Sequence, residues 1–378
     1  MINTECKNIA YFQELITEPQ NVLIEQAVDE GMIPIGYTCT YVPVPILSAG
    51  KLFPVRVRAP GIAGTEMADN YLSSVICSYT RSLLEFAIDG RYDLFGGWVF
   101  VASCDHLRRL WDNLSYLKKP AFSHMLDLPH KGADAGLDWY VEEIRTLAER
   151  LSSHFGADMG GASLEKSIRQ YNELVALLSS IGELRKKDRP PITGADFHRV
   201  LMASQVSPTR LIEPHIRRFR DELGDGEGER EPRARLMLVG GELDDPEYIR
   251  VIESLGGVVV ADRFCTGSIP GLDPVIMTGD PLKDVALHSF RKTLCPRMME
   301  DFNTRVDRII EAVNEYRVHG VIIQIVKFCD IWGVESGPLV AALREAGIPV
   351  LKLEREYRLS GEGQLRTRVQ AFLESMGR

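Results

Sequence analysis

The sequence comprises 378 residues, which is long enough for two or more domains. Its composition, 45% hydrophobic and 26% charged, is typical of globular proteins and excludes fibrous and disordered classes. The formal net charge of -9 argues against a nucleic-acid-binding protein, because phosphate contacts need a basic surface, and the densest basic run, 185–189, is interpreted as a solvated helix end. No stretch approaches the roughly 18 apolar residues of a membrane span and the N-terminus lacks a signal-peptide pattern, so a cytoplasmic location is expected.

The first part of the chain, residues 1–135, is predicted to consist of an N-terminal arm and an α/β unit. Residues 1–30 favour helix and form the arm. Strands and helices then alternate, which is the pattern of a parallel sheet. The expected elements are a strand, a helix and a strand over 33–57, a helix over 68–89, a strand over 98–102 and a helix over 105–117.

Residues 136–223 form a predicted helical insertion, since they carry hardly any strand pattern. A glycine-rich acidic linker, 224–232, marks the boundary to a second α/β part, 233–378. In the insertion, helices are expected over 137–155, 163–184, 194–203 and 208–223. In the second α/β part, strands are expected over 235–240, 257–261, 321–326 and 349–353, and helices over 246–255, 300–317, 336–346 and 364–376.

Two segments about 225 residues apart repeat one pattern, Gly-Trp-Val-Phe-Val-Ala-Ser-Cys-Asp at 97–105 and Gly-Val-Ile-Ile-Gln-Ile-Val-Lys-Phe-Cys-Asp at 320–330. Each apolar run is typical of a strand buried in a parallel sheet, and the Asp is a preferred cap for a following helix. The repeat predicts a duplicated α/β unit. Ligands bind at the carboxyl edge of such sheets, so Cys104 and Cys329 are predicted to share one site.

Two more cysteines follow the same repeat. Cys77 precedes Cys104 by 27 residues and Cys295 precedes Cys329 by 34 residues, each with a helical stretch between the two cysteines. This spacing supports the duplication and brings a second cysteine of each unit toward the shared edge.

The remaining cysteines are Cys39 and Cys265, which follow two other predicted strands, and Cys6 in the arm. In a reducing compartment, seven widely spaced cysteines indicate thiols or soft-metal ligands rather than disulfides. The lack of a C-x-x-C pair weakens a structural zinc site. Any single cysteine could instead be an inert core residue, but the repeated position favours a ligand role for Cys104 and Cys329.

Seven segments, spread in one order over nearly the whole chain, together resemble one known family. They are Gly36-Tyr-Thr-Cys-Thr-Tyr-Val-Pro43, Val75-Ile-Cys-Ser-Tyr-Thr-Arg-Ser-Leu-Leu-Glu85, Ser103-Cys-Asp105, Phe264-Cys-Thr-Gly-Ser268, Leu294-Cys-Pro-Arg297, Lys327-Phe-Cys-Asp330 and Gln364-Leu-Arg-Thr-Arg-Val-Gln-Ala-Phe372. They resemble the benzoyl-CoA reductase/2-hydroxyacyl-CoA dehydratase D-component family. A likeness of this extent is more specific than any single motif.

The resemblance implies two Rossmann-like halves with helical additions and an oxygen-sensitive 4Fe-4S cluster between them. On this chain the family's ligand motifs fall on Cys77, Cys104 and Cys329. Three cysteines leave one iron open to water, sulfide or a substrate carbonyl, as a catalytic zinc keeps an open position. The implied partners are a homologous sister subunit, a separate ATP-hydrolysing iron-sulfur activator and an acyl-CoA substrate.

Cys39, Cys265 and Cys295 also lie in family-like motifs, and they are alternative further ligands. Six ligands would suit two 4Fe-4S cubanes joined through a sulfide, as in family members that reduce small molecules. The chain departs from the motif of those members after residues 264–268, where Ile-Pro-Gly-Leu-Asp replaces an arginine and aromatic residues. The resemblance therefore implies three ligands and leaves a double cubane open.

The activity that the resemblance implies first is a benzoyl-CoA reductase, with this chain as the cluster-bearing subunit. The alternatives are a 2-hydroxyacyl-CoA dehydratase subunit, a double-cubane reductase of small molecules and a non-catalytic partner subunit. The sequence has no GxxxxGKS/T motif, so the chain is not expected to bind ATP itself.

A few other residues carry weaker predictions. His106 could donate a proton near the cluster, or make a structural hydrogen bond in the first turn of its helix. Arg81 and Glu85 are expected to form a helical ion pair. A tight turn is expected at Gly240-Gly241. The tryptophans are assigned to the core, and they are Trp98, Trp111, Trp139 and Trp332.

Overall fold

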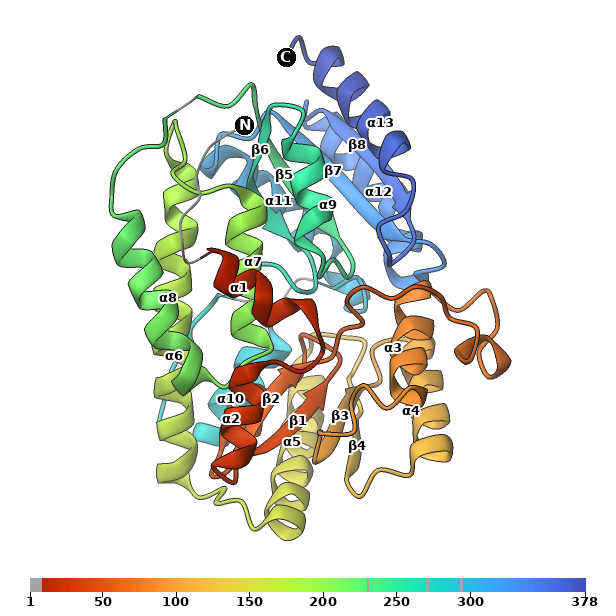
Figure 1. Cartoon of the computed structure of the whole chain (residues 1–378), viewed down its shortest axis with the longest axis vertical. Coiled ribbons are helices and arrows are strands. Elements are labelled where there is room, and N and C mark those ends of the chain that lie inside the picture. The colour runs from red at the N-terminus through yellow and green to blue at the C-terminus, as the bar shows by residue number, and fades with distance from the viewer. Residues whose placement is uncertain (1–8, 230, 269–271, 293–294) are drawn as a thin grey trace.

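The computed structural model of the chain describes residues 9–229, 231–268, 272–292 and 295–378 (Figure 1). It contains two four-stranded parallel sheets of the same topology, with strand orders β2-β1-β3-β4 and β6-β5-β7-β8. The expected α/β fold of two pseudo-symmetric halves is thereby confirmed. The strands are β1 (Ile33–Tyr37), β2 (Leu52–Arg56), β3 (Gly97–Val101), β4 (Ser123–Leu126), β5 (Ala234–Gly240), β6 (Gly257–Arg263), β7 (Gly320–Val326) and β8 (Val350–Arg355).

The two repeated apolar runs form β3 and β7, which take the same inner place in their sheets. Every residue of both strands is buried. Helices cover both faces of an inner parallel strand, so its side chains meet protein on each side and an uninterrupted apolar run is required. This explains why these two strands were the clearest in the sequence.

Thirteen α-helices lie in the described part of the chain. They are α1 (Ile9–Thr17), α2 (Val22–Asp29), α3 (Ser78–Ile88), α4 (Asp105–Lys118), α5 (Asp134–Phe155), α6 (Gly161–Gly182), α7 (Gly194–Gln205), α8 (Thr209–Leu223), α9 (Pro246–Glu253), α10 (Pro281–Phe290), α11 (Phe302–Glu315), α12 (Asp330–Glu345) and α13 (Glu362–Ser375).

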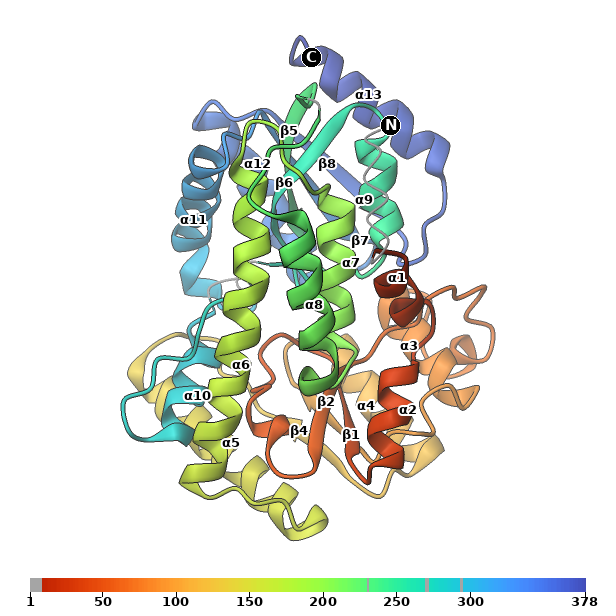
Figure 2. The same ribbon diagram turned by 60° about the vertical axis from the view of Figure 1, so that its left-hand side comes forward.

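Helices α5 to α8 join the two halves, as expected for the helical insertion. The long helix α6 runs beside both sheets, and α7 and α8 lie next to it (Figure 2). Helix α7 contacts β2 and β6, the equivalent edge strands of the two sheets. The helical segment therefore braces both halves at matching edges.

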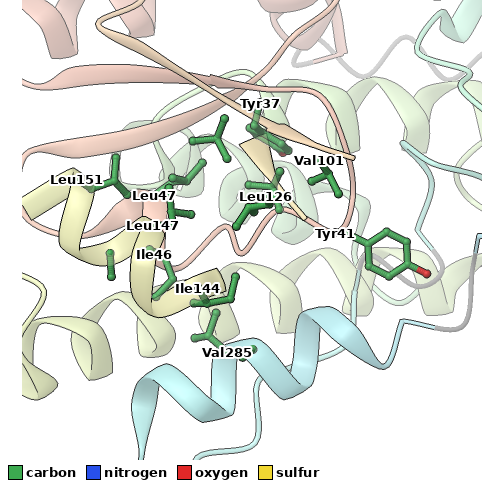
Figure 3. Packing of buried hydrophobic residues seen from close by; sticks show 14 of the residues in the cluster. Tyr37, Tyr41, Ile46, Leu47, Val101, Leu126, Ile144, Leu147, Leu151 and Val285 are labelled. Carbon is green, nitrogen blue, oxygen red and sulfur yellow. The ribbon is translucent and has the colours of Figure 1, made fainter. Parts of the chain in front are cut away.

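The core of the first half lies between its sheet and helices α5 and α10 (Figure 3). Ile144, Leu147 and Leu151 of α5 project toward the sheet at helical spacing and are fully buried. Val285 of α10 packs into the same cluster, although its helix follows the second sheet's strand β6 in the chain. The second half thus completes the core of the first.

Some expected elements differ from the structure. The helix expected over 68–89 is a short 3-10 turn at 68–70 and then α3, because Ser73 draws the backbone into a turn that ends near residue 76. Only a 3-10 turn, Ile46–Ser48, lies between β1 and β2, since Pro43 and Pro45 disfavour a longer helix there. The expected helix over 336–346 begins earlier, at Asp330.

Strand β4 and helix α10 were absent from the prediction. Strand β4 has four residues that are alternately half-buried and buried, too short a pattern to stand out. Helix α10 starts at an Asp280-Pro281 pair, and the Asp280 side chain accepts a hydrogen bond from the Lys283 N–H. That capping signal is readable in the sequence.

Within the described residues, none of the helices combines the length and the apolar character that crossing a bilayer requires. The cytoplasmic location stays a prediction, as do the domain boundaries at 135, 223 and 233. Cys6 lies outside the described residues.

Candidate metal centre

Three cysteines stand at the first positions of three helices. Cys77 is the N-cap of α3, Cys104 the N-cap of α4 and Cys329 the N-cap of α12. Cys104 and Cys329 follow their strands β3 and β7 by three residues each. Because these strands are equivalent in the two sheets, the repeat brings a thiol from each half to one place. We call these three cysteines the first triad.

The sulfurs of the first triad lie close enough to repel one another as thiolates. Burial raises the pKa of Cys329 to about 12, with a further increase from the Cys77 charge. Burial likewise raises the pKa of Cys104 well above its usual value, with added increases from Cys77 and Cys329. Without a cation nearby, these three thiols stay protonated in the folded protein.

The helix N-termini partly oppose the increase in pKa that burial causes at these thiols. None of the three side chains makes a capping hydrogen bond of full geometry. The backbone N–H groups of Thr80, Leu107 and Trp332 nevertheless lower the pKa of Cys77, Cys104 and Cys329 respectively. Each thiolate would therefore lie at the positive end of a helix, where anions are favoured.

The other three described cysteines form a second group, which we call the second triad: Cys39, Cys265 and Cys295. Burial raises the pKa of Cys295 to about 12, and the charge of Cys39 raises it further. Burial also raises the pKa of Cys265 well above its usual value, and the charges of Cys295 and Cys39 add to the increase. All six described cysteines are free thiols.

The two triads are neighbours, and each is shared between the halves. Cys104 is affected by the charge of Cys39, and Cys295 by that of Cys329. The first half supplies Cys77 and Cys104 to the first triad, and the second half supplies Cys329. The second triad combines Cys39 of the first half with Cys265 and Cys295 of the second half. The structure therefore brings all six described cysteines to one region between the two sheets, including the four that were expected at strand ends, Cys39, Cys104, Cys265 and Cys329.

The donor set suits an iron-sulfur cluster. Thiolates are the usual ligands of such clusters, and a polynuclear iron centre would supply the positive charge that the buried sulfurs lack. Among the described residues, no three Cys, His, Asp or Glu side chains are close enough to hold one metal ion. A cubane binds each thiolate through a different iron, so its ligands lie farther apart than those of a single ion.

His106 contacts residues of both halves beside the first triad. Its Nδ1 accepts a hydrogen bond from the Cys77 N–H at 3.3 Å, and its Nε2 lies 3.3 Å from Asp330 Oδ2. Burial lowers the pKa of His106, so the neutral ring, with Nε2–H directed at Asp330, fits both contacts. This geometry agrees with the structural alternative given above, and a role as proton donor stays a prediction.

A chain of buried polar contacts, absent from the sequence prediction, holds the halves together beside the triads. Arg58 Nε donates to Asp244 Oδ2 at 3.0 Å, and the Tyr357 hydroxyl donates to the same carboxylate at 2.6 Å. Arg56 pairs with Glu242, and burial raises the pKa of that carboxyl while the Arg56 charge opposes the increase. The signal that could have revealed this network is two arginines at the end of a strand, where a buried charge needs a partner.

The predicted turn at Gly240-Gly241 positions Glu242. Gly240 has φ +147°, and a Cβ at this position would lie 1.9 Å from the carbonyl oxygen of Gln324 in β7. Only glycine permits so close an approach. The turn therefore sends the chain across the end of β7 toward the first half.

Two predictions, the Arg81–Glu85 ion pair and the solvated helix end at 185–189, differ from the structure. Arg81 pairs with Asp69 at 2.9 Å, while the Glu85 carboxylate instead accepts the N–H groups of Met67 and Ala68. Residue 185 is no solvated helix end, because Arg185 is 1% exposed and pairs with Asp262.

Two of the four tryptophans, Trp98 and Trp332, are buried as expected. Trp111 is partly buried and donates to Ser123 at 2.6 Å, and Trp139 is 57% exposed. Trp139 lies near the start of α5, on the face away from the buried stripe of that helix.

Comparison with known proteins gives one matching family and several relatives of similar length. The family described as 2-hydroxyglutaryl-CoA dehydratase, D-component, matches residues 39–376. The chain is 23% identical to the (R)-phenyllactyl-CoA dehydratase beta subunit of Clostridium sporogenes, over 97% of each chain. It is 24% identical to a subunit of the benzoyl-CoA reductase of Thauera aromatica, over 90% of each chain. It is 21% identical to the beta subunit of the (R)-2-hydroxyglutaryl-CoA dehydratase of Acidaminococcus fermentans, over 97% of this chain and 98% of that one.

Proposed function

The chain belongs to the 2-hydroxyglutaryl-CoA dehydratase, D-component family, and we propose that it is the iron-sulfur cluster-bearing subunit of an ATP-dependent enzyme. The proposed reaction is a low-potential one-electron reduction of an acyl-CoA thioester, of the benzoyl-CoA reductase type. The prediction of an enzyme subunit is confirmed by relatives that are named as dehydratase and reductase subunits. The observation that carries the proposal is the gathering of six buried or half-buried free thiols between the halves.

In this proposal the first triad binds the cluster and the neighbouring residues support it. Cys77, Cys104 and Cys329 would hold the cluster, which when bound supplies single electrons to the substrate carbonyl. The helix N-termini stabilise their thiolates, and His106 keeps the Cys77 backbone in place against Asp330. Buried apolar neighbours, such as Trp332, keep water away from the sulfurs. A dry site preserves strong electrostatic interactions during electron transfer.

The second triad supports a second candidate, a reductase with two joined cubanes. Cys39, Cys265 and Cys295 are half-buried free thiols, and the charges of neighbouring cysteines raise the pKa of Cys265 and Cys295 just as they do for Cys104 and Cys329. A cubane at the first triad alone would leave three more coupled thiols beside it without a task. The names of the relatives support a third reading, a 2-hydroxyacyl-CoA dehydratase subunit.

The first test is to purify the chain without oxygen and to count iron and acid-labile sulfide. We expect about four of each per chain for one cubane and about eight for two. Zinc, or no metal after reconstitution with iron and sulfide, would contradict the cluster.

The second test separates reduction from dehydration. The chain is combined with its sister subunit, an ATP-hydrolysing activator and a strong reductant, and electrons and ATP are counted per product. Ring reduction of benzoyl-CoA consumes electrons in stoichiometric amounts, whereas dehydration returns its electron and needs ATP only for activation. Catalytic amounts of ATP and an enoyl-CoA product from a 2-hydroxyacyl-CoA would favour the dehydratase over our first proposal. Full activity of the sister subunit without this chain's cysteines would indicate a non-catalytic partner.

A further inference from the structure

A cavity of about 420 Å³ runs along β2, the edge strand of the first sheet. Its lining includes Lys51, just before this strand, and Arg56, the last residue of the strand. Side chains of α6 and α7 form much of the opposite wall. Sites for small molecules measure about 300–1,000 Å³, so the cavity has room for a modest organic ligand.

The charge of the lining is opposite to the charge of the whole protein. Five cationic residues and one carboxylate line the cavity, although the chain carries a net charge of -9. Two of the cations are already paired, Arg56 with Glu242 and Arg210 with Glu30. The other three have no carboxylate within ion-pair distance among the residues that the structure describes, and they are Lys51, Lys166 and Lys292.

Lys292 lies at the end of the cavity that meets the second triad. It lines the cavity together with Cys265, and its backbone carbonyl accepts a hydrogen bond from the Tyr41 hydroxyl at 3.1 Å. Burial lowers the pKa of Lys292 to about 8, and the charges of Asp273 and Cys39 only partly oppose that decrease. A poorly solvated ammonium group without a close counter-ion gains more from an anion than a surface lysine does.

Arg56, at the same end, has a buried hydrogen-bond donor that is not used within the described part of the chain. Its Nε has no hydrogen-bond partner among the described residues, and neither does Oε2 of its partner Glu242. Buried polar atoms are normally satisfied, so each exception calls for an explanation. A ligand that reorganised this pair could satisfy these atoms.

The middle of the cavity suits an apolar body. Leu174, Leu178 and Leu201 contribute to its helical wall, and Phe53 and Tyr37 to the side of the sheet. These side chains favour hydrocarbon or aromatic groups over a purely inorganic ion. The lining therefore combines a cationic end with an apolar wall.

We propose that this cavity binds a small organic carboxylate, with its carboxylate at Lys292 and its apolar body along α6. The ligand would lie next to the second triad. This site goes beyond the proposed function and does not depend on it, because no cluster is needed to form the cavity.

The test uses the full chain without added metal, with benzoate as the probe and benzamide as its uncharged counterpart, in isothermal titration calorimetry. A hydrogen bond to a charged group is worth about 1.5–3 kcal/mol, so we expect benzoate to bind about tenfold to a hundredfold more tightly than benzamide. Lys292→Met should remove this preference, while Lys292→Arg should retain most of it. Lys118→Met on α4, outside the lining, is the control for a general loss of charge.

Unfolding midpoints of all variants, measured in parallel, separate loss of binding from loss of structure. Equal affinities for benzoate and benzamide, no binding, or unchanged binding by a folded Lys292→Met variant would overturn the proposal. Binding of benzoyl-CoA alone, weakened by Lys166→Met and not by Lys292→Met, would assign the cavity to a thioester instead. None of these results bears on iron content, so the cluster assignment is tested separately.

Discussion

At the scale of single residues, the cysteines show how position decides chemistry. Cys104 and Cys329 occupy matching places, three residues beyond equivalent buried strands and at the start of a helix. The same residue type within a core would be inert. Here the location at a sheet edge gives these thiols both neighbours and stabilising N–H groups.

Replacing Cys104 or Cys329 by serine should abolish iron binding while the fold is kept, because a hydroxyl is a poor ligand for iron-sulfur clusters. Iron content after anaerobic reconstitution and circular dichroism would measure the two effects. Cys6→Ser, outside every motif, is the control and should bind iron normally. Full iron content in both variants would show that the first triad does not hold the cluster.

The second triad gives a sharper version of this experiment. With two cubanes, Cys265→Ser should lower the iron content from about eight to about four atoms per chain. With one cubane at the first triad, the same variant should leave the iron content at about four. An iron content of zero would show that Cys265 is essential to a single cluster, which neither arrangement predicts.

The buried ring of His198 makes the fold sensitive to acid. Burial lowers the pKa of His198 to about 4, and the ring packs edge-on against Phe264 with centroids 5.3 Å apart. An unfolded histidine titrates near 6.5, so between pH 6.5 and 4 the unfolded state binds a proton that the folded state does not. The free energy of unfolding must therefore fall as the pH decreases through this window.

Accordingly, His198→Gln should lose less stability than the wild type between pH 7.5 and 4.5, by roughly 2 kcal/mol. Urea unfolding of the metal-free protein at both pH values measures this difference. The comparison at pH 7.5, above both pKa values, records any packing cost of the substitution. Parallel pH dependences of the two proteins would show that His198 does not control the acid response.

At the scale of elements, the turn after β5 requires glycine at position 240. A Cβ on Gly240 would clash with the Gln324 carbonyl in the neighbouring strand, so Gly240→Ala should destabilise the protein by about 3 kcal/mol or more. Gly337→Ala is the matched control, since nothing lies within 4 Å of its Cβ position in α12. That variant should be neutral or slightly more stable. Chemical denaturation of both variants measures the contrast, and similar stabilities would refute the claimed clash.

The elements also show what could be predicted from the sequence. Strands β3 and β7 were predictable because burial on both faces requires long apolar runs, and their repeat revealed the duplication. The helix predicted over 68–89 was right over α3 and wrong before it, because residues 71–77 form turns in which Tyr71 and Val75 are exposed rather than buried on a helix face. Helical periodicity alone cannot distinguish these cases.

For the candidate site, the residue pattern predicted one site shared by Cys104 and Cys329, whereas the grouping of all six cysteines came from the family resemblance and not from their spacing. Three-dimensional docking sets Cys39 with Cys265 and Cys295, and Cys329 with Cys77 and Cys104. The buried pairs of Arg56 and Arg58 were also unpredictable, because their partners lie 186 residues away. A strand-end arginine signals the need for a carboxylate but does not identify it.

At the scale of the whole molecule, the proposed function requires that a separate protein hydrolyse ATP. The chain lacks a P-loop motif, so the purified chain should not hydrolyse ATP, and its reductase activity should depend on a separate ATPase. A phosphate-release assay with and without the activator measures this. Robust ATP hydrolysis by the isolated chain would contradict the proposal. If docking uses the protein's acidic surface, the activity should fall as the salt concentration rises.

The contacts between the two halves also set an order of events in folding. They join residues that are far apart in the chain: 186 residues for Arg58 and Asp244, 225 for Thr40 and Cys265, and 298 for Ala59 and Tyr357. The entropic cost of closing such long loops grows only logarithmically with length, but folding slows when most contacts are distant. Each parallel sheet can form within its own half, whereas both triads exist only after the halves dock. Loading of a metal centre would therefore be the last step of maturation, and a newly made chain would hold its thiols apart until then.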